Sequence, residues 1–464
     1  MDSISRKRSN IILKQNPIWK GLIYLAFPVF LANILKTLHN IVDTLFIGLI
    51  PNQIVATQMQ AAIGLTWPIF FVFLSFGIGL SVASNGLIGQ FIGKKDNENA
   101  EKYATNTVYL SILLGFIFNA FVFFFGPLIL KLIGVESDVL EYATIYIRIR
   151  SFEMPAVFLV FAFQAIRRAT GDTLTPVIIN SIAITINIIL TAVLILGFNL
   201  GITGAAIATL VGQLVMIPIV LYFLINAKNG IKIKFKTKYI NFPIIKKITL
   251  IAFPASSGQS IQAIGFVILN GMIYSFGDYV TAAFFIGNRI TSLVMFPVSS
   301  ITSIIAIYVA QNIGAGNIVR AKKSVKEGMV MSIIIMAIGI SILLPFRYTI
   351  VGWFSHDNET VNNAVQYMFY IGIGLPLMAI FQAYLSTFQG SGDTHLSFIL
   401  AVVRLWIFRL PFVWYTMKYT NLGPLGIWYS MLMSNVLAAI IGTLLYTRVK
   451  FMPKIKTAEI RRPI

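Results

Sequence analysis

Long apolar stretches recur along the whole chain, separated by short polar turns. A helix of about 20 apolar residues is long enough to cross a bilayer core of about 30 Å. The stretches in this chain reach or exceed that length, so we interpret them as membrane-spanning helices. The pattern predicts twelve of them, at roughly 20–48, 56–88, 103–133, 140–168, 174–197, 202–226, 244–275, 281–313, 324–352, 361–388, 395–418 and 424–448.

Prolines stand inside the predicted spans, and six of them are taken as markers of kinks. A proline removes one backbone donor and clashes with the preceding turn, so it tends to bend a helix. Membrane helices tolerate such bends. We therefore expect kinks at these positions and take Pro28 as a hinge in the first helix; the others are Pro68, Pro155, Pro218, Pro297 and Pro376.

Composition agrees with a membrane protein. Of the 464 residues, 57% are hydrophobic and only 11% are charged, against about a quarter charged in soluble domains. This excludes a soluble enzyme, a disordered chain and a collagen-like fibre. Outer-membrane barrels are built from strands of about ten alternating residues, and the long apolar runs exclude them as well.

The residues that most catalytic and metal sites need are scarce. The chain has no cysteine, and its three histidines, His39, His356 and His395, are far apart in the sequence. The GxxxxGK[ST] loop that holds nucleotide phosphates is absent. We therefore expect a protein that is not an enzyme, has no cofactor and is not driven by ATP.

Basic and acidic residues lie in loops on opposite sides of the membrane. Most of the 36 Lys and Arg lie in the two terminal segments and in the loops after the even-numbered spans, whereas Glu136, Asp138 and Asp357 lie in opposite loops. By the positive-inside rule, both termini are cytoplasmic. The N-terminal arm lacks the apolar core of a signal peptide. Topology and attraction to anionic lipid then explain the net charge of +20, and we expect no nucleic-acid partner.

The second half of the chain repeats motifs of the first at offsets of 221 to 226 residues. Ala26-Phe27-Pro28 returns as Ala252-Phe253-Pro254, Gln90-x-Ile92-Gly93 as Gln311-x-Ile313-Gly314, Gly171-Asp172-Thr173 as Gly392-Asp393-Thr394, and Asn199-Leu200-Gly201 as Asn421-Leu422-Gly423. Each half has six helices, an even number, so both insert with the same orientation. Parallel repeats of this kind are typical of secondary transporters, whose substrate site lies between the halves.

The repeat divides the chain into five segments. We predict a cytoplasmic N-terminal arm, a first lobe, a cytoplasmic linker, a second lobe and a cytoplasmic basic tail, at 1–19, 20–227, 228–243, 244–449 and 450–464.

At these motifs the chain resembles the multidrug and toxic compound extrusion (MATE) transporters, nearer their DinF-like branch. The resemblance covers essentially all twelve spans. It implies an all-α membrane protein of two parallel six-helix repeats. The phrases that carry it are Leu38-His39-Asn40-Ile41-Val42-Asp43, the two Gln-x-Ile-Gly loops, Gly171-Asp172-Thr173, Gly204-Ala205-Ala206-Ile207-Ala208-Thr209, Ile286-Gly287-Asn288-Arg289-Ile290 and Arg404-Leu405-Trp406.

Asp43 is the sharpest candidate for function, because an ionisable residue inside a span is costly. At 100° per residue, Asn33, Lys36, Asn40 and Asp43 fall within an arc of about 80° on the first helix, with His39 at its edge. The fifth and sixth helices add a second polar set: Asn180, Asn187, Thr191 and Thr209.

This constellation suits a cation. A carboxylate among amide and hydroxyl oxygens can hold a hard cation such as Na⁺. When the same carboxylate is partly desolvated, its pKa rises and it can take up a proton instead. The resemblance implies that Asp43, Asn187 and Thr209 match the first-lobe cation site of similar transporters. Thr191 departs from it, because an aspartate commonly stands there. With a single carboxylate, protonation of Asp43 is the simpler coupling.

Several alternatives remain for the polar residues of the first lobe. Asp43 can form a structural salt bridge with Lys36, and Lys36 can stand in for a bound cation. His39 is either a second proton carrier or a packing residue. For Glu153, we expect an ion pair with Arg150, three residues earlier on the same face.

The second half has no acid well inside its predicted spans. Ser256 and Ser260 stand on the seventh helix instead, and Arg409 is expected to pair or to reach the interface. The resemblance gives Arg289 and Arg404 structural or gating roles. We take four residues as candidates for lining a second-lobe cavity: Gln259, Gln262, Arg289 and Arg404.

These observations favour a secondary antiporter in the cell membrane, acting as a monomer. It would export amphipathic, cationic organic compounds in exchange for H⁺ or Na⁺ by alternating access, with aromatic residues and methionines contacting the substrate. The alternative is a flippase for a lipid-linked saccharide, which predicts an anion-binding cavity and independence from Asp43.

Overall fold

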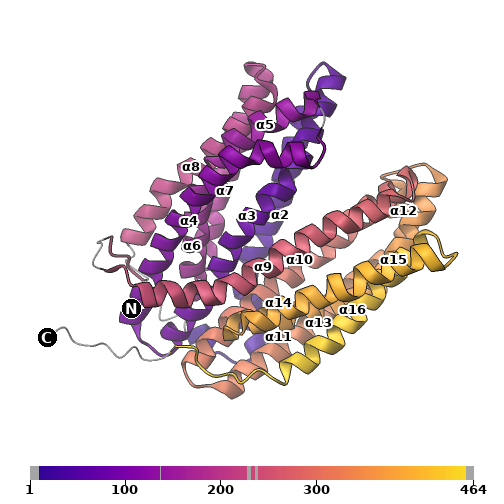
Figure 1. The fold of residues 1–464 in the computed structure, drawn as a ribbon. Coiled ribbons are helices and arrows are strands. Elements are labelled where there is room, and N and C mark those ends of the chain that lie inside the picture. The colour runs from indigo at the N-terminus through magenta and orange to yellow at the C-terminus, as the bar shows by residue number, and fades with distance from the viewer. Residues whose placement is uncertain (1–9, 136, 227–230, 236–238, 456–464) are drawn as a thin grey trace.

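The computed structural model describes residues 10–135, 137–226, 231–235 and 239–455, and for residues 39–44 and 137 it describes only the backbone. Long helices make up almost all of this part of the chain. They form two bundles, one from each half of the sequence (Figure 1). The bundles meet at the end where both termini lie, which we call the joined end. They diverge toward the end where α5 and α12 lie, which we call the splayed end.

Each half contributes six membrane-crossing units, some of them broken. The first half comprises α2 (Ile18–Gly48), α3 (Gln53–Gly93), α4 (Asn97–Leu132), α5 (Ser137–Ser151), α6 (Met154–Ala169), α7 (Leu174–Ala192), η1 (Val193–Gly197) and α8 (Gly201–Ile225). The second half comprises α9 (Phe242–Tyr274), α10 (Asp278–Gly314), α11 (Ile318–Leu343), α12 (Arg347–Gly352), α13 (Asn358–Ser391), α14 (Thr394–Val402), η3 (Val403–Arg409), α15 (Leu410–Tyr419) and α16 (Pro424–Tyr446).

Ten of the described helices are long and apolar enough to cross a membrane by themselves. The bent pair of α5 and α6 makes an eleventh span, with an angle of 50° at the break. Helix α9 has 33 residues and is long enough to cross a membrane, but it is less apolar than these spans. Its serines and glutamines lower its hydropathy, and its packing against α3 and α14 keeps these polar groups within the protein.

Most of the six prolines expected to mark kinks lie inside continuous helices. Helix α2 continues through Pro28, and four other helices likewise contain their proline. Of these six prolines, Pro155 adjoins a break, at the start of α6. The departures from α-helical hydrogen bonding are instead the π-helical segments η1 and η3, neither of which contains a proline.

The repeat found in the sequence is also present in the backbone. Gly171 and Gly392 both have a φ near +80°, and Gly201 and Gly423 have φ values of 51° and 57°. Such positive φ values favour glycine, which explains why it returns at these turns. The side chains of Asp96 and Asn317 cap α4 and α11 in the same way, each accepting a hydrogen bond from a backbone amide three residues later.

The two halves meet through a reciprocal packing of helices. From the first half, α2 packs against α10 and α3 packs against both α9 and α10. Exchange of the halves turns the pair α2–α10 into the pair α9–α3, so the interface has an approximate two-fold axis. This is the arrangement expected of two parallel repeats.

The Gln-x-Ile-Gly motifs form the centre of the joined end. A Cβ atom on Gly93 would lie 1.9 Å from the Gln311 carbonyl oxygen, and one on Gly314 would lie 1.9 Å from the Gln90 carbonyl oxygen. Each glutamine side chain reaches the opposite half: Gln90 donates to the Ser391 carbonyl and Gln311 donates to the Ala169 carbonyl, at 3.3 and 2.7 Å. Only glycine permits this approach of α3 to α10.

Terminal segments cross this joined end in both directions. The Arg320 guanidinium donates to the carbonyl oxygens of Ile12 and Gln15, which binds the N-terminal segment to the second half. Lys454 follows the last helix, and its backbone amide donates to Gln90 Oε1 of the first half at 2.8 Å. Part of the predicted basic tail is therefore packed against the bundle.

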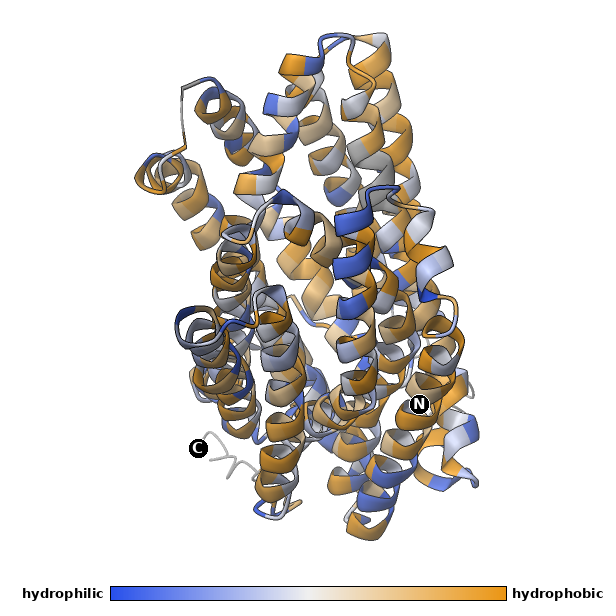
Figure 2. Cartoon of the chain, turned by 90° about the vertical axis from the view of Figure 1, so that its right-hand side faces the viewer, coloured by the Kyte–Doolittle hydropathy of each residue, from blue (hydrophilic) through white to orange (hydrophobic). Residues whose placement is uncertain are grey.

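Hydrophobic residues cover most of the length of the helices, and hydrophilic residues gather at the turns between them (Figure 2). Large apolar side chains such as Phe124, Ile334 and Leu444 are more than half exposed. On a water-soluble protein so many exposed apolar residues would be a liability, whereas on a membrane protein they face lipid. The chain is therefore a multi-pass membrane protein.

Candidate functional site

A polar pair joins α7 to α8 inside the first half. Asn187 of α7 is 4% exposed and donates from Nδ2 to Thr209 Oγ1 of α8 at 3.2 Å. The Thr209 hydroxyl in turn donates to the Ala205 carbonyl at 2.9 Å. Close approach of the helices is possible because Gly212 of α8 lies against Asn187 and Ala183. The chain of bonds fixes the orientation of the Asn187 amide.

Two oxygen atoms at this place have no partner among the described residues. They are Asn187 Oδ1 and the hydroxyl oxygen of Thr191, which is 1% exposed. The two residues are four apart and therefore lie on one face of α7. A buried polar atom without a hydrogen bond costs about 1–3 kcal/mol. A buried oxygen without a hydrogen bond is often explained by an ion or a water molecule that binds to it.

Helix α2 lies beside this face, since it packs against α7 and also touches α8. Asp43, His39 and Asn40 belong to the helical backbone of α2, and their side chains lie outside the described residues. The roles predicted for these three side chains stay predictions. The arrangement of helices agrees with a site formed by α2, α7 and α8.

The other polar residues predicted for this set are more dispersed. Asn33 of α2 donates toward the hydroxyls of Ser299 and Ser300 on α10, at 3.3 and 3.2 Å, so it bonds to the opposite half. Lys36 is exposed and has no ion pair within the described part of the chain. Asn180 is half-buried on α7, two turns before Asn187.

The ion pair predicted for Glu153 is confirmed. The Arg150 guanidinium donates to both carboxylate oxygens of Glu153, with the shorter distance 2.5 Å. Its Nη1 donates to the Tyr146 hydroxyl at 3.2 Å, and its plane lies 4.8 Å from the centre of the Phe70 ring. Glu153 lies at the break between α5 and α6, and its charge is neutralised there.

Within the membrane-spanning helices of the second half, two buried charges are basic. Arg409 of η3 is 3% exposed and donates to Ser434 and Asn435 of α16 at 2.9 and 2.8 Å. Arg404 is 2% exposed, contacts the Met378 sulfur and lies 4.3 Å from the centre of the Phe381 ring. The sequence did not reveal these partners, because Ser434 and Asn435 are ordinary helix residues until η3 is placed beside α16.

The four candidates for a second-lobe cavity do not form one cluster. Arg289 is exposed on α10, Gln259 and Gln262 are half-buried on α9, and Arg404 is buried on η3. No hydrogen bond or ion pair joins these four side chains in the residues that the structure describes. Their common role stays a prediction.

Comparison with known proteins decides the family. The MatE family model matches residues 28–193 and 254–415, which together make up more than two thirds of the chain. The chain belongs to the MATE family of transporters. It is therefore a transport protein and not an enzyme, and the MATE resemblance seen in the sequence is confirmed.

Relatives and solved structures in this family extend over nearly the whole chain. The protein named "Probable multidrug resistance protein YoeA" of Bacillus subtilis is 27% identical over 418 residues, 89% of each chain. The multidrug export protein MepA of Staphylococcus haemolyticus is 25% identical, covering 92% of this chain and 93% of its own. A MOP superfamily transporter from Pyrococcus furiosus has the same fold, with a TM-score of 0.88 at 22% identity over 97% of this chain and 99% of that one.

The family assignment confirms the predicted fold class of an all-α membrane protein with two parallel six-helix repeats. The division into lobes, the placement nearer the DinF-like branch and the residues of the cation site stay predictions. Thr191 provides a neutral oxygen at the position where the family resemblance implies an aspartate.

Proposed function

We propose that this MATE protein is a secondary antiporter that exports organic compounds in exchange for H⁺ or Na⁺, with Asp43 as the coupling residue. The observation that carries the proposal is the pair of buried, unpartnered oxygens on α7, Asn187 Oδ1 and Thr191 Oγ1, beside the helix that bears Asp43. They provide acceptors for a bound cation or for a protonated carboxyl group. Glu153, the other acid well inside a first-half span, is already paired with Arg150.

The chemistry of this donor set allows either ion. Neutral amide and hydroxyl oxygens with one carboxylate can coordinate Na⁺, a cation that prefers oxygen ligands. The same carboxylate, when protonated, can donate its hydrogen to Asn187 Oδ1 or Thr191 Oγ1. In both cases one negative charge at Asp43 is neutralised, and the cost of keeping it inside the membrane disappears.

Helix α2 offers a route from this charge to the other half. Asn33 lies ten residues before Asp43, about 15 Å along the helix, and donates to Ser299 and Ser300 of α10. A shift of α2 toward α7 on neutralisation of Asp43 would therefore change its contact with the second half. Ions and substrate would then favour different arrangements of the two halves.

We further propose that the substrates are amphipathic organic cations. The related proteins YoeA and MepA are named for multidrug resistance and export. Both termini of this chain would be cytoplasmic in the plasma membrane, so the splayed end faces outward. Anionic lipid would attract the basic loops, and one chain would suffice for transport, without a nucleic-acid partner.

The test is efflux of a fluorescent organic cation from proteoliposomes under separately imposed H⁺ and Na⁺ gradients. We expect one gradient to drive export by the wild type and Asp43→Asn to reduce that export to the rate of empty liposomes. Asp278→Asn is the matched control, because it removes an exposed acid at the start of α10. Equal rates for Asp43→Asn and the wild type would contradict the proposal.

A further inference from the structure

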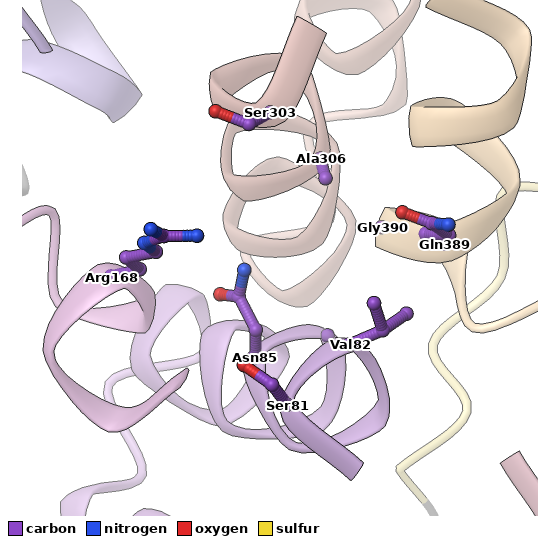
Figure 3. A pocket seen from close by; sticks show the side chains of 9 residues that line it. Ser81, Val82, Asn85, Arg168, Ser303, Ala306, Gln389 and Gly390 are labelled. Carbon is purple, nitrogen blue, oxygen red and sulfur yellow. The ribbon is translucent and has the colours of Figure 1, made fainter. Parts of the chain in front are cut away.

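A small polar cavity lies between the two halves, close to the joined end. Its volume is about 90 Å³, and four helices line it: α3, α6, α10 and α13. Its polar side chains are those of Ser81, Asn85, Arg168, Ser303 and Gln389. Figure 3 shows Arg168 and Asn85 extending toward the same space from α6 and α3, with Gln389 on the other side.

This cavity lies on the axis that relates the repeats. Val82 and Ser303, Asn85 and Ala306, and Arg168 and Gln389 all line it, and each pair is separated by 221 residues, the offset of the Gly-Asp-Thr motifs. The lining is thus built from equivalent positions of the two halves. Charge breaks the symmetry, because one half presents Arg168 where the other presents the neutral Gln389.

Arg168 forms no ion pair with any carboxylate of the described residues. Its Nε is buried without a hydrogen-bond partner, and among the described residues no carboxylate forms an ion pair with it. The neighbouring Arg167 differs in this respect, since its Nε lies 3.7 Å from the Asp172 carboxylate. None of the nine residues that line the cavity is acidic. Asn85 Oδ1 is also buried without a partner.

Arg168 is half-buried, with its Nε fully buried. A partly desolvated guanidinium without a counter-charge is costly, and the cost falls when an anion binds. The cavity has room for a few water molecules or one small anionic group. A whole drug-sized ligand needs about 300 Å³ or more, so only an anionic group of such a molecule fits in this cavity. Arg168 lies at the carboxyl end of α6, where the helix dipole favours a positive charge. The arginine therefore stays charged when no anion is bound.

We propose that this cavity binds a single small anionic group, held by the Arg168 guanidinium and the amide of Gln389. Because these two side chains belong to opposite halves, the anion joins α6 to α13 and stabilises the closed state of the joined end. The group is either a free anion such as chloride or the carboxylate of a molecule that the protein carries. The site is separate from the cation site on α7 and does not depend on the direction or the driving ion of transport.

The test is the thermal unfolding midpoint of the full-length protein in detergent, with chloride replacing the bulky anion MES at constant ionic strength. We expect the wild-type midpoint to rise with chloride and to saturate, with a shift of about 2 °C or more. Arg168→Gln puts a glutamine at the position equivalent to Gln389, and this variant should lose the shift. Arg168→Lys keeps a positive charge and should retain part of the shift. Lys326→Gln removes an exposed cation of α11 and should behave as the wild type.

A second arm replaces chloride by carboxyfluorescein in MES buffer and distinguishes the two sources of the anion. A shift with chloride identifies a free anion, and a shift with the dye alone identifies the carboxylate of a carried molecule. Either shift must disappear in Arg168→Gln. If that variant does not fold, retention of the shift in Arg168→Lys with saturation at higher ligand concentration supports the site. No shift in either arm, or a full shift in Arg168→Gln, would overturn the proposal.

Discussion

The two halves of the molecule share a backbone and differ in their buried polar residues. On α7 and α8 the first half has uncharged oxygens, two of them without partners, and at the 226-residue offset of the Ala-Phe-Pro motifs Leu269 takes the place of Asp43 in the second half. Leu269 is fully buried in an apolar cluster. Arg404 and Arg409 are buried charges of the same half, and both are basic. The proposed ion site would therefore belong to one half of a scaffold whose backbone is repeated.

The joined end shows the opposite behaviour. Its glutamines and glycines are the same in both halves, and each glutamine reaches a carbonyl of the other half. Here the two-fold relation is itself the structural requirement, because α3 and α10 must approach each other equally. Symmetry is therefore kept where the halves touch and lost where ions or substrate would bind.

The largest effect is expected from a side chain at the crossing of α3 and α10. Gly93→Ala and Gly314→Ala each place a Cβ 1.9 Å from a backbone oxygen, which forces the halves apart. Overpacking of this kind costs about 1–3 kcal/mol or more. We expect both variants to lower the unfolding midpoint by the same amount, measured by thermal unfolding in detergent.

Gly271→Ala is the control for this pair, because a Cβ there meets nothing within 4 Å. Symmetry of the joined end would be disproved if only one of the two glycine variants differed from that control.

Much of this arrangement follows from the sequence alone. The twelve spans, the repeat and the Arg150–Glu153 pair were predicted from apolar length, motif offsets and helical spacing. The link from Asn33 to Ser299 and Ser300 was not predicted, because it joins residues 266 and 267 positions apart. The π-helical segments were missed as well, since no proline or glycine marks η3 and proline was the only signal used for a break.

An intermediate effect is expected from Arg409, which tests whether the basic residues of the second half are structural. Arg409→Met removes two hydrogen bonds and leaves Asn435 Oδ1 without its donor. Loss of hydrogen bonds to a charged group costs about 1.5–3 kcal/mol. We expect a lower unfolding midpoint, whereas the ion dependence of efflux by the folded protein stays as in the wild type. A change of driving ion would show that the second half takes part in coupling.

The smallest effect on stability is expected at Thr191. Unlike the glycine and arginine variants, this variant should be more stable than the wild type. Thr191→Val keeps the shape of the side chain and removes a buried hydroxyl without a partner. Unfolding should become less favourable by up to about 1 kcal/mol, since the cost of the lone hydroxyl disappears. Efflux should nevertheless fall several-fold. Thr185→Val on the same helix removes an exposed hydroxyl that already donates to the Ser181 carbonyl, and it should leave efflux unchanged.

The most direct measurement is the number of coupling ions that the purified protein exchanges when it binds substrate. Proton release into a weakly buffered detergent solution and displacement of radioactive Na⁺ are measured for the wild type, Asp43→Asn and Asp278→Asn. We predict one ion per molecule for the wild type and for Asp278→Asn, and none for Asp43→Asn, because the two sites are linked through a single carboxylate. Release of an ion from Asp43→Asn would contradict the assignment of coupling to the first half.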